Sequence, residues 1–83
     1  MVITDIAPCM KVTKENDMSG VDMYIEIGDH IKITDDKSNI FIGKLSFIEW
    51  SKYKEEDDMI SLLLDDGNVT SIGVSYIEDI DRL

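Results

Sequence analysis

Residues 40–50 read IFIGKLSFIEW, and this stretch decides the fold class because its apolar residues change parity part-way along. They stand first at odd and then at even positions: Phe41, Leu45 and Phe47, followed by Ile48 and Trp50. Side chains of a strand alternate between its two faces, so a change of parity within one β-prone run predicts a bulge or a sharp bend. Gly43 offers a place for curvature. Long bent strands are typical of small barrels, and the run therefore favours an all-β fold.

Four further strands are predicted around this run. Between Met23 and Asp35 the isoleucines occupy odd positions and polar residues the even ones, which indicates one half-buried strand. An Asp-Gly pair at residues 66–67 is a strong hairpin signal, because glycine accepts a positive φ. The expected strands are residues 25–34, 40–50, 59–64, 69–72 and 77–83. Adjacent strands joined by short turns would form one antiparallel sheet.

The 83 residues allow one domain with an extension in front of it. Residues 1–22 are expected to be this N-terminal extension, either a loop or one extra strand, because Pro8 and Gly20 interrupt any helix. Alternate apolar residues such as Met10 and Val12 allow the extra strand, and residues 14–22 favour a loop. Residues 23–83 are expected to form the barrel.

Five short strands with a bent second strand suggest an SH3-like barrel, and within that group the residues resemble the Sm-like family over residues 24–81. The first Sm-like motif corresponds to these positions: Ile27, Gly28, Ile31, Ile33, Phe41, Gly43, Leu45, Ile48 and Glu49. The second motif corresponds to residues 71–77. The resemblance implies a five-stranded Sm-like small barrel and places RNA binding among the functions to consider.

The positions that bind RNA in Sm-like proteins differ in this chain. The family's Asp after the bent strand corresponds to Glu49, and the following residues 50–53 contain no Asn. The second motif lacks the family's Arg beside Gly73. A divergent Sm-like RNA-binding protein is therefore the alternative function, and nucleic acid is not the expected partner.

The charge balance argues against a polyanion partner as well. Eight basic residues stand against 18 acidic ones, for a net charge of −10, and residues 54–83 alone hold two basic and nine acidic residues. Phosphate recognition draws its affinity from Lys and Arg. No apolar run approaches the ~20 residues of a membrane span. The single cysteine, Cys9, excludes an internal disulfide and suits a reducing compartment, so a cytoplasmic location without membrane contact is expected.

Metal, cofactor and catalytic sites are not expected. The acidic stretches at residues 35–36 and 65–68 lack the ligand spacing of a calcium loop and are interpreted as turns. A nucleophilic pair of Cys9 and His30 would need an activating geometry that the sequence does not indicate. The chain is therefore expected to have no enzymatic activity. A domain that senses a ligand or a metal is a third hypothesis.

Protein binding or self-assembly is the function that the sequence favours. Trp50 and Tyr53 are the candidate anchors, because aromatic residues are enriched at interaction hot spots. Val69 and Ile72 belong to a short strand without charge or proline, which leaves its edge open to pairing with another chain. A homo-oligomer is expected, with a dimer favoured, and its association should strengthen with salt because each subunit is strongly acidic.

Overall fold

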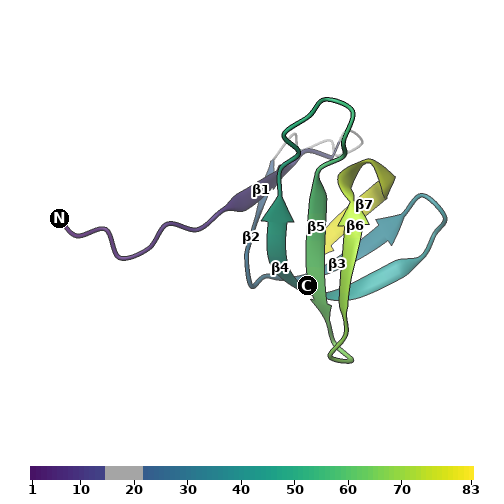
Figure 1. Cartoon of the computed structure of the whole chain (residues 1–83). Coiled ribbons are helices and arrows are strands. Elements are labelled where there is room, and N and C mark those ends of the chain that lie inside the picture. Colours follow the sequence, from purple (N-terminus) through teal and green to yellow (C-terminus); the bar gives the residue numbers. More distant parts are fainter. Residues whose placement is uncertain (15–21) are drawn as a thin grey trace.

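The structure of this chain is a computed structural model that describes residues 1–14 and 22–83 (Figure 1). Its elements in chain order are β1 (Cys9–Val12), β2 (Met23–Glu26), β3 (His30–Asp35), β4 (Ile40–Glu49), β5 (Met59–Leu64), β6 (Val69–Gly73), the 3₁₀-helix η1 (Val74–Tyr76) and β7 (Ile77–Arg82). The predicted all-β class is confirmed. No helix in the described ranges has the length and apolar character to cross a membrane.

Five antiparallel strands form the main sheet, in the order β6-β5-β4-β3-β7, and β1 and β2 pair separately. The last strand lies beside the first strand of this sheet, with Ile31 opposite Arg82. The sheet is not closed into the barrel that the sequence predicts, because β6 and β7 remain at its two ends. After β6 the Val74 amide donates to the carbonyl of Asp58 at 2.8 Å, and η1 turns the chain away before β7 begins.

The predicted bulge lies at Ser46. Leu45 pairs with Leu62 and Phe47 pairs with Ser61, so Ser46 is an extra residue without a partner in β5. Leu45 and Ile48 both point into the core, while Phe47 points outward and is 57% exposed. The parity change is therefore confirmed, and it falls before Phe47. Ser46 donates its hydroxyl to the Ser61 carbonyl at 3.1 Å, which ties the bulge to β5.

The single strand predicted over residues 25–34 is wrong, because a turn divides it into β2 and β3. Gly28 has φ +96°, a conformation that side chains disfavour, and the Asp29 amide donates to the Glu26 carbonyl at 3.0 Å. The Asp29 carboxylate also accepts from the Glu26 amide at 2.8 Å. Ile27 keeps the odd parity but lies in this turn, with its side chain exposed. The turn could not be recognised from the sequence, because isoleucines occupy odd positions before it, within it and after it.

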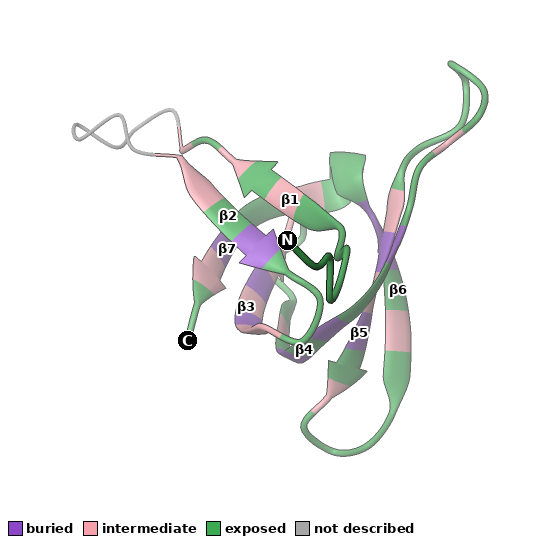
Figure 2. Cartoon of the chain, turned by 90° about the vertical axis from the view of Figure 1, so that its left-hand side faces the viewer, coloured by how far each residue is buried: buried purple, intermediate pink, exposed green. Residues whose placement is uncertain are grey.

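The N-terminal extension contributes to the core. β1 and β2 form a hairpin that packs on the main sheet, and Ile25 of β2 is fully buried (Figure 2). Met10 and Val12 of β1 pack against the same cluster, so residues 9–12 of the extension form a strand, one of the two alternatives expected for it. Residues 15–21 of the predicted loop lie outside the described residues. The buried core of the described chain is aliphatic: Ile25, Ile31, Ile33, Leu45, Ile48, Ile60, Leu62, Ile72 and Ile80.

Replacing Gly43 with Ala should destabilise the fold, because β4 and β5 approach each other too closely there for a Cβ atom. A Cβ at this position would meet the Leu63 carbonyl and lie 2.8 Å from the Leu64 Cα. Overpacking of this kind costs ~1–3 kcal/mol. Lys44→Ala, at the next and exposed position of β4, is the matched control and should change the free energy of unfolding by less than ~0.5 kcal/mol. Equal urea midpoints for the two variants would contradict the prediction.

Candidate functional site

A groove of about 1050 Å³ lies between the N-terminal hairpin and the main sheet. Its apolar floor is the edge of the core at Ile48, Ile60 and Ile80, which are buried, and the half-buried Met10, Val12 and Ile77 add apolar surface beside them. Val74 of η1 and Trp50 after β4 add apolar surface at its rim. The bulge creates this arrangement, because it directs Ile48 inward and sends the chain beyond Glu49 toward the groove. The volume is of the order that protein binding sites have.

Two strands present their edges to the groove. Residues 9–14, which include all of β1, line it without interruption, and so do residues 77–80 of β7. Side chains of a strand alternate between faces, so a run of consecutive lining residues indicates that the strand turns its edge to the groove. Within the described chain β1 pairs only with β2, and β7 only with β3. Each strand therefore has one edge whose backbone groups are open to a further strand.

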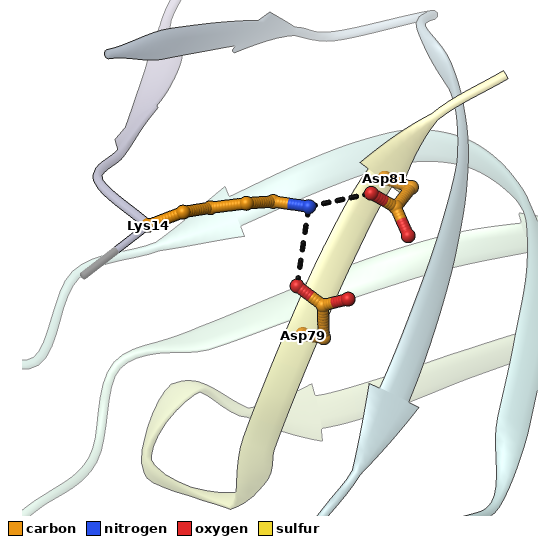
Figure 3. Close-up of polar contacts among 3 residues, drawn as sticks. All are labelled: Lys14, Asp79 and Asp81. Carbon is orange, nitrogen blue, oxygen red and sulfur yellow. Dashed lines mark hydrogen bonds and ion pairs between the residues drawn. The ribbon is translucent and has the colours of Figure 1, made fainter. Parts of the chain in front are cut away.

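An ion-pair cluster joins the two walls of the groove. Lys14 follows β1, and its ammonium group lies 3.2 Å from the Asp79 carboxylate and hydrogen-bonds to Asp81, both on β7 (Figure 3). The hydrogen bond to Lys14 holds the pKa of Asp81 below its usual value. The hydrogen bond to Asp81 in turn raises the pKa of Lys14. This cluster fixes the spacing of β1 and β7 where β1 ends.

The rim beside Trp50 is fixed by two aspartates of the loop between β4 and β5. The Asp58 carboxylate accepts from the Ser51 amide at 2.6 Å. The Asp57 carboxylate accepts from both the amide and the hydroxyl of Ser75 in η1, at 3.0 and 2.7 Å. The C-terminal end of the acidic loop is thus tied both to the start of the same loop at Ser51, directly after Trp50, and to η1. These contacts hold the backbone beside Trp50 while its indole stays 62% exposed.

A second, shallower depression adjoins the groove and is almost entirely apolar. Its exposed apolar lining residues are Pro8, Ile27, Phe47 and Trp50. Trp50 also lines the groove, so it is shared between the two hollows. Single apolar residues are ordinary on protein surfaces, but neighbouring ones indicate a contact surface. Trp50 therefore stands at the centre of the exposed apolar surface on this side of the molecule.

The four residues predicted to contact a partner, Trp50 and Tyr53 as anchors and Val69 and Ile72 on an open strand edge, lie in different places. Trp50 lines the groove, as described above, whereas Tyr53 is exposed in the following loop and lines neither hollow. Val69 is exposed at the start of β6, which is an edge strand of the main sheet. Ile72 is only 8% exposed and its side chain belongs to the core, while its strand β6 lies at the edge of the sheet. The structure does not bring these four side chains together.

The parts of the groove that the sequence did not reveal are Lys14 and the edges of β1 and β7. Asp79 and Asp81 stand two apart, a spacing that predicts a shared strand face, but nothing in the sequence joins them to a lysine 67 positions earlier than Asp81. The free edge of β1 could not be predicted either, because whether a strand edge is free depends on which strands pair with it in the folded chain.

The acidic stretches are turns, as predicted. The Asp35 carboxylate accepts from the amides of Lys37 and Asn39 at 2.9 and 2.8 Å, and Asp66 accepts from the Asn68 amide at 2.9 Å. The imidazole of His30 lies 3.0 Å from the Asp65 carboxylate across the sheet. Residues 1–14 and 22–83 contain no cluster of three or more His, Cys, Asp or Glu side chains arranged to hold a metal ion.

Comparison of the chain with protein families, with curated proteins and with solved structures finds no match. The chemistry of the groove therefore has to be inferred from its own residues. Those residues supply strand edges, an aliphatic floor and one indole. Of the charged groups beside them, Lys11, Lys14, Asp58 and Asp79 are engaged by neighbours within the chain, and Glu78 of β7 is exposed.

Replacing Lys14 with Gln should reduce the free energy of unfolding at pH 7 by up to ~1 kcal/mol, the range for partly exposed ion pairs. Folding lowers the pKa of Asp81, so its contribution is present above the ordinary carboxyl pKa and is lost as the pH falls through the folded value. The deficit of the variant should therefore shrink below about pH 4.

Urea unfolding of the two proteins at several pH values measures this deficit. Lys52→Gln is the control, because Lys52 forms no ion pair with any of the described residues. A Lys14→Gln deficit that stays constant down to about pH 2 would contradict the assignment of its cause to the carboxylates.

RNA should not bind at physiological salt. Lys52 and Lys54 lie beside the exposed Trp50 and Tyr53, a combination able to stack bases, but exposed Glu55 and Glu56 follow at once. Their charge opposes the accumulation of phosphate groups at this loop. We expect no change in the fluorescence anisotropy of short uridine-rich or adenine-rich RNA. Binding at micromolar concentration or below would contradict this and support the RNA-binding alternative.

Proposed function

We propose that the chain is a non-enzymatic protein-interaction module that binds an extended, apolar polypeptide segment in the groove. The observation that carries this proposal is the placement of two unpaired strand edges beside one aliphatic floor, with Trp50 at the rim. A strand that enters the groove would bond its backbone to an edge and pack alternate side chains on the floor. Peptide recognition by strand addition uses the same two elements.

The charge distribution supports an apolar occupant in place of a charged one. Lys11 lies 3.4 Å from Asp22, and Lys14 is held by the two aspartates of β7. Asp58 at the rim is engaged by the Ser51 amide. Both lysines of the groove and Asp79 are therefore in ion pairs, Glu78 of β7 is exposed, and aliphatic side chains form the floor. A charged residue entering the groove would lose water, and both lysines and Asp79 already have counter-charges within the chain, so the site favours residues such as Val, Ile and Leu.

We propose further that the fold is a divergent, open relative of the SH3-like and Sm-like barrels. Three features support the assignment: β7 pairs with β3, β4 is long and bulged, and a 3₁₀-helix precedes the last strand. The Sm-like positions Ile31, Ile33 and Leu45 are buried, and Gly28 adopts a positive φ in a turn. In such an open fold the free edge of β7 would be the place for an added strand.

An extended peptide should therefore bind with its backbone as well as its side chains. A seven-residue peptide of alternating Val and Thr is the probe, and Trp50 is the reporter because it is the only tryptophan in the chain. We expect the peptide to shift the Trp50 emission to shorter wavelength and to reach saturation. A version with proline at every second position should bind at least about tenfold more weakly, because proline removes backbone donors.

Equal binding of the two peptides would contradict recognition by strand addition. Tyr53→Phe is the matched protein control, since Tyr53 is an exposed aromatic residue in the loop that directly follows Trp50 but lies outside the groove. This variant should bind the Val-Thr peptide as the unaltered chain does. No emission change with any apolar peptide would overturn the proposed function.

A further inference from the structure

Residues 1–8 form an exposed segment that leaves the body of the protein ahead of β1 (Figure 1). We call residues 1–7 the tail. Four of its residues are β-branched and prefer extended strands: Val2, Ile3, Thr4 and Ile6. Ile6 is 83% exposed, and no strand pairs with the tail in the described chain. The same molecule thus has a strand-forming segment without a partner and a groove with unpaired strand edges.

We propose that the tail of one copy occupies the groove of a second copy, and that two copies exchange tails reciprocally to form a dimer. This inference rests on the proposed function, for which it names the occupant of the groove. An extended tail of seven residues spans ~23 Å, and β7, with six residues, spans ~20 Å. The tail is therefore long enough to lie along a whole edge.

The alternation of side chains along the tail matches a groove whose apolar surface lies on one side of the added strand. Val2, Thr4 and Ile6 are two residues apart, so in an extended strand they point to the same side. These three side chains would face Ile48, Ile60 and Ile80. The only charged side chain of the tail, Asp5, belongs to the opposite side and would face solvent. A strand added in this register would cover the floor without placing a charge on it.

The junction between tail and body favours a second copy over the tail's own groove. Pro8 fixes its own φ, and the residue before a proline is restricted to extended conformations, so Ala7-Pro8 carries the chain straight into β1. To enter the groove beside its own β1, the tail would have to reverse direction at this point.

Net charge also favours exchange of tails over contact between whole bodies. Each copy has a net charge of −10, and bodies that pair edge to edge would bring these charges close together. The tail has one acidic residue and no basic one, so it can enter a second copy with little repulsion of its own. Reciprocal exchange fills both grooves and leaves no tail free, which closes the assembly at two copies.

Two neighbouring substitutions to the same residue test the proposal: Ile6→Asn removes an apolar side chain from the inner side of the tail, and Asp5→Asn alters only its outer side. Light scattering and sedimentation should show a dimer for the unaltered chain at about 100 µM, which strengthens from about 0.15 M to about 1 M salt. Ile6→Asn should weaken the dimer about 10- to 100-fold. Asp5→Asn should leave it unchanged or slightly stronger.

A synthetic peptide with the sequence of residues 1–8 provides the second measurement, because it contains no tryptophan. It should dissociate the dimer of the unaltered chain. It should also bind the Ile6→Asn variant with a shift in Trp50 emission and a stoichiometry of one peptide per chain. Because Ile6 is exposed in the described chain, Ile6→Asn should fold normally, and circular dichroism checks this.

The outcomes separate this inference from the proposed function. Binding of the Val-Thr peptide without binding of the tail peptide would overturn the inference and leave the proposed function standing. A monomeric unaltered chain that refuses the tail peptide, while Ile6→Asn accepts it, would show that the tail occupies its own groove and would overturn exchange. A dimer broken by Val69→Lys in β6 and unaffected by Ile6→Asn would assign assembly to the β6 edge instead.

Discussion

At Ser46 the register between β4 and β5 slips by one residue, and every later side chain of β4 changes sides. Ile48 then enters the core and the floor of the groove, while Phe47 is left on the outer surface. Beyond the end of the strand, Trp50 reaches the border between the two hollows. Core packing and the exposed apolar surface therefore depend on the same extra residue. In a β4 strand without the bulge, Phe47 would point into the core and Ile48 would point to the outer surface.

The acidic residues of this chain are not only a diffuse surface charge. Asp57 and Asp58 hold the loop after Trp50 to η1 and to Ser51, and Asp79 and Asp81 hold the end of β1 through Lys14. Asp57, Asp79 and Asp81 each bind a donor in another part of the fold, and Asp58 binds the start of its own loop. The groove thus obtains its shape from polar contacts at its margin and its chemistry from the aliphatic residues between them.

Local patterns predicted the strands well, because alternation and turn chemistry are properties of neighbouring residues. The parity change at residues 40–50 indicated the bulge, and Asp66-Gly67 indicated the hairpin between β5 and β6. The turn at Gly28 was missed, because Ile27 continues the parity of the strands on either side. The groove could not be predicted, since the contact of Lys14 with Asp81 and the free edges of β1 and β7 arise from tertiary arrangement.

The pairing of β3 with β7 has a consequence for how the chain folds. Strands β4, β5 and β6 follow one another as hairpins and can pair as soon as each is present, but β3 acquires its second neighbour only when β7 arrives. Such a non-local closure costs chain entropy before its contacts form, and it slows folding. During synthesis the aliphatic side chains of the hairpins formed first would stay exposed to solvent until residues 77–82 emerge from the ribosome. In that interval the exposed apolar surface is largest, and a chaperone would protect the chain from aggregation.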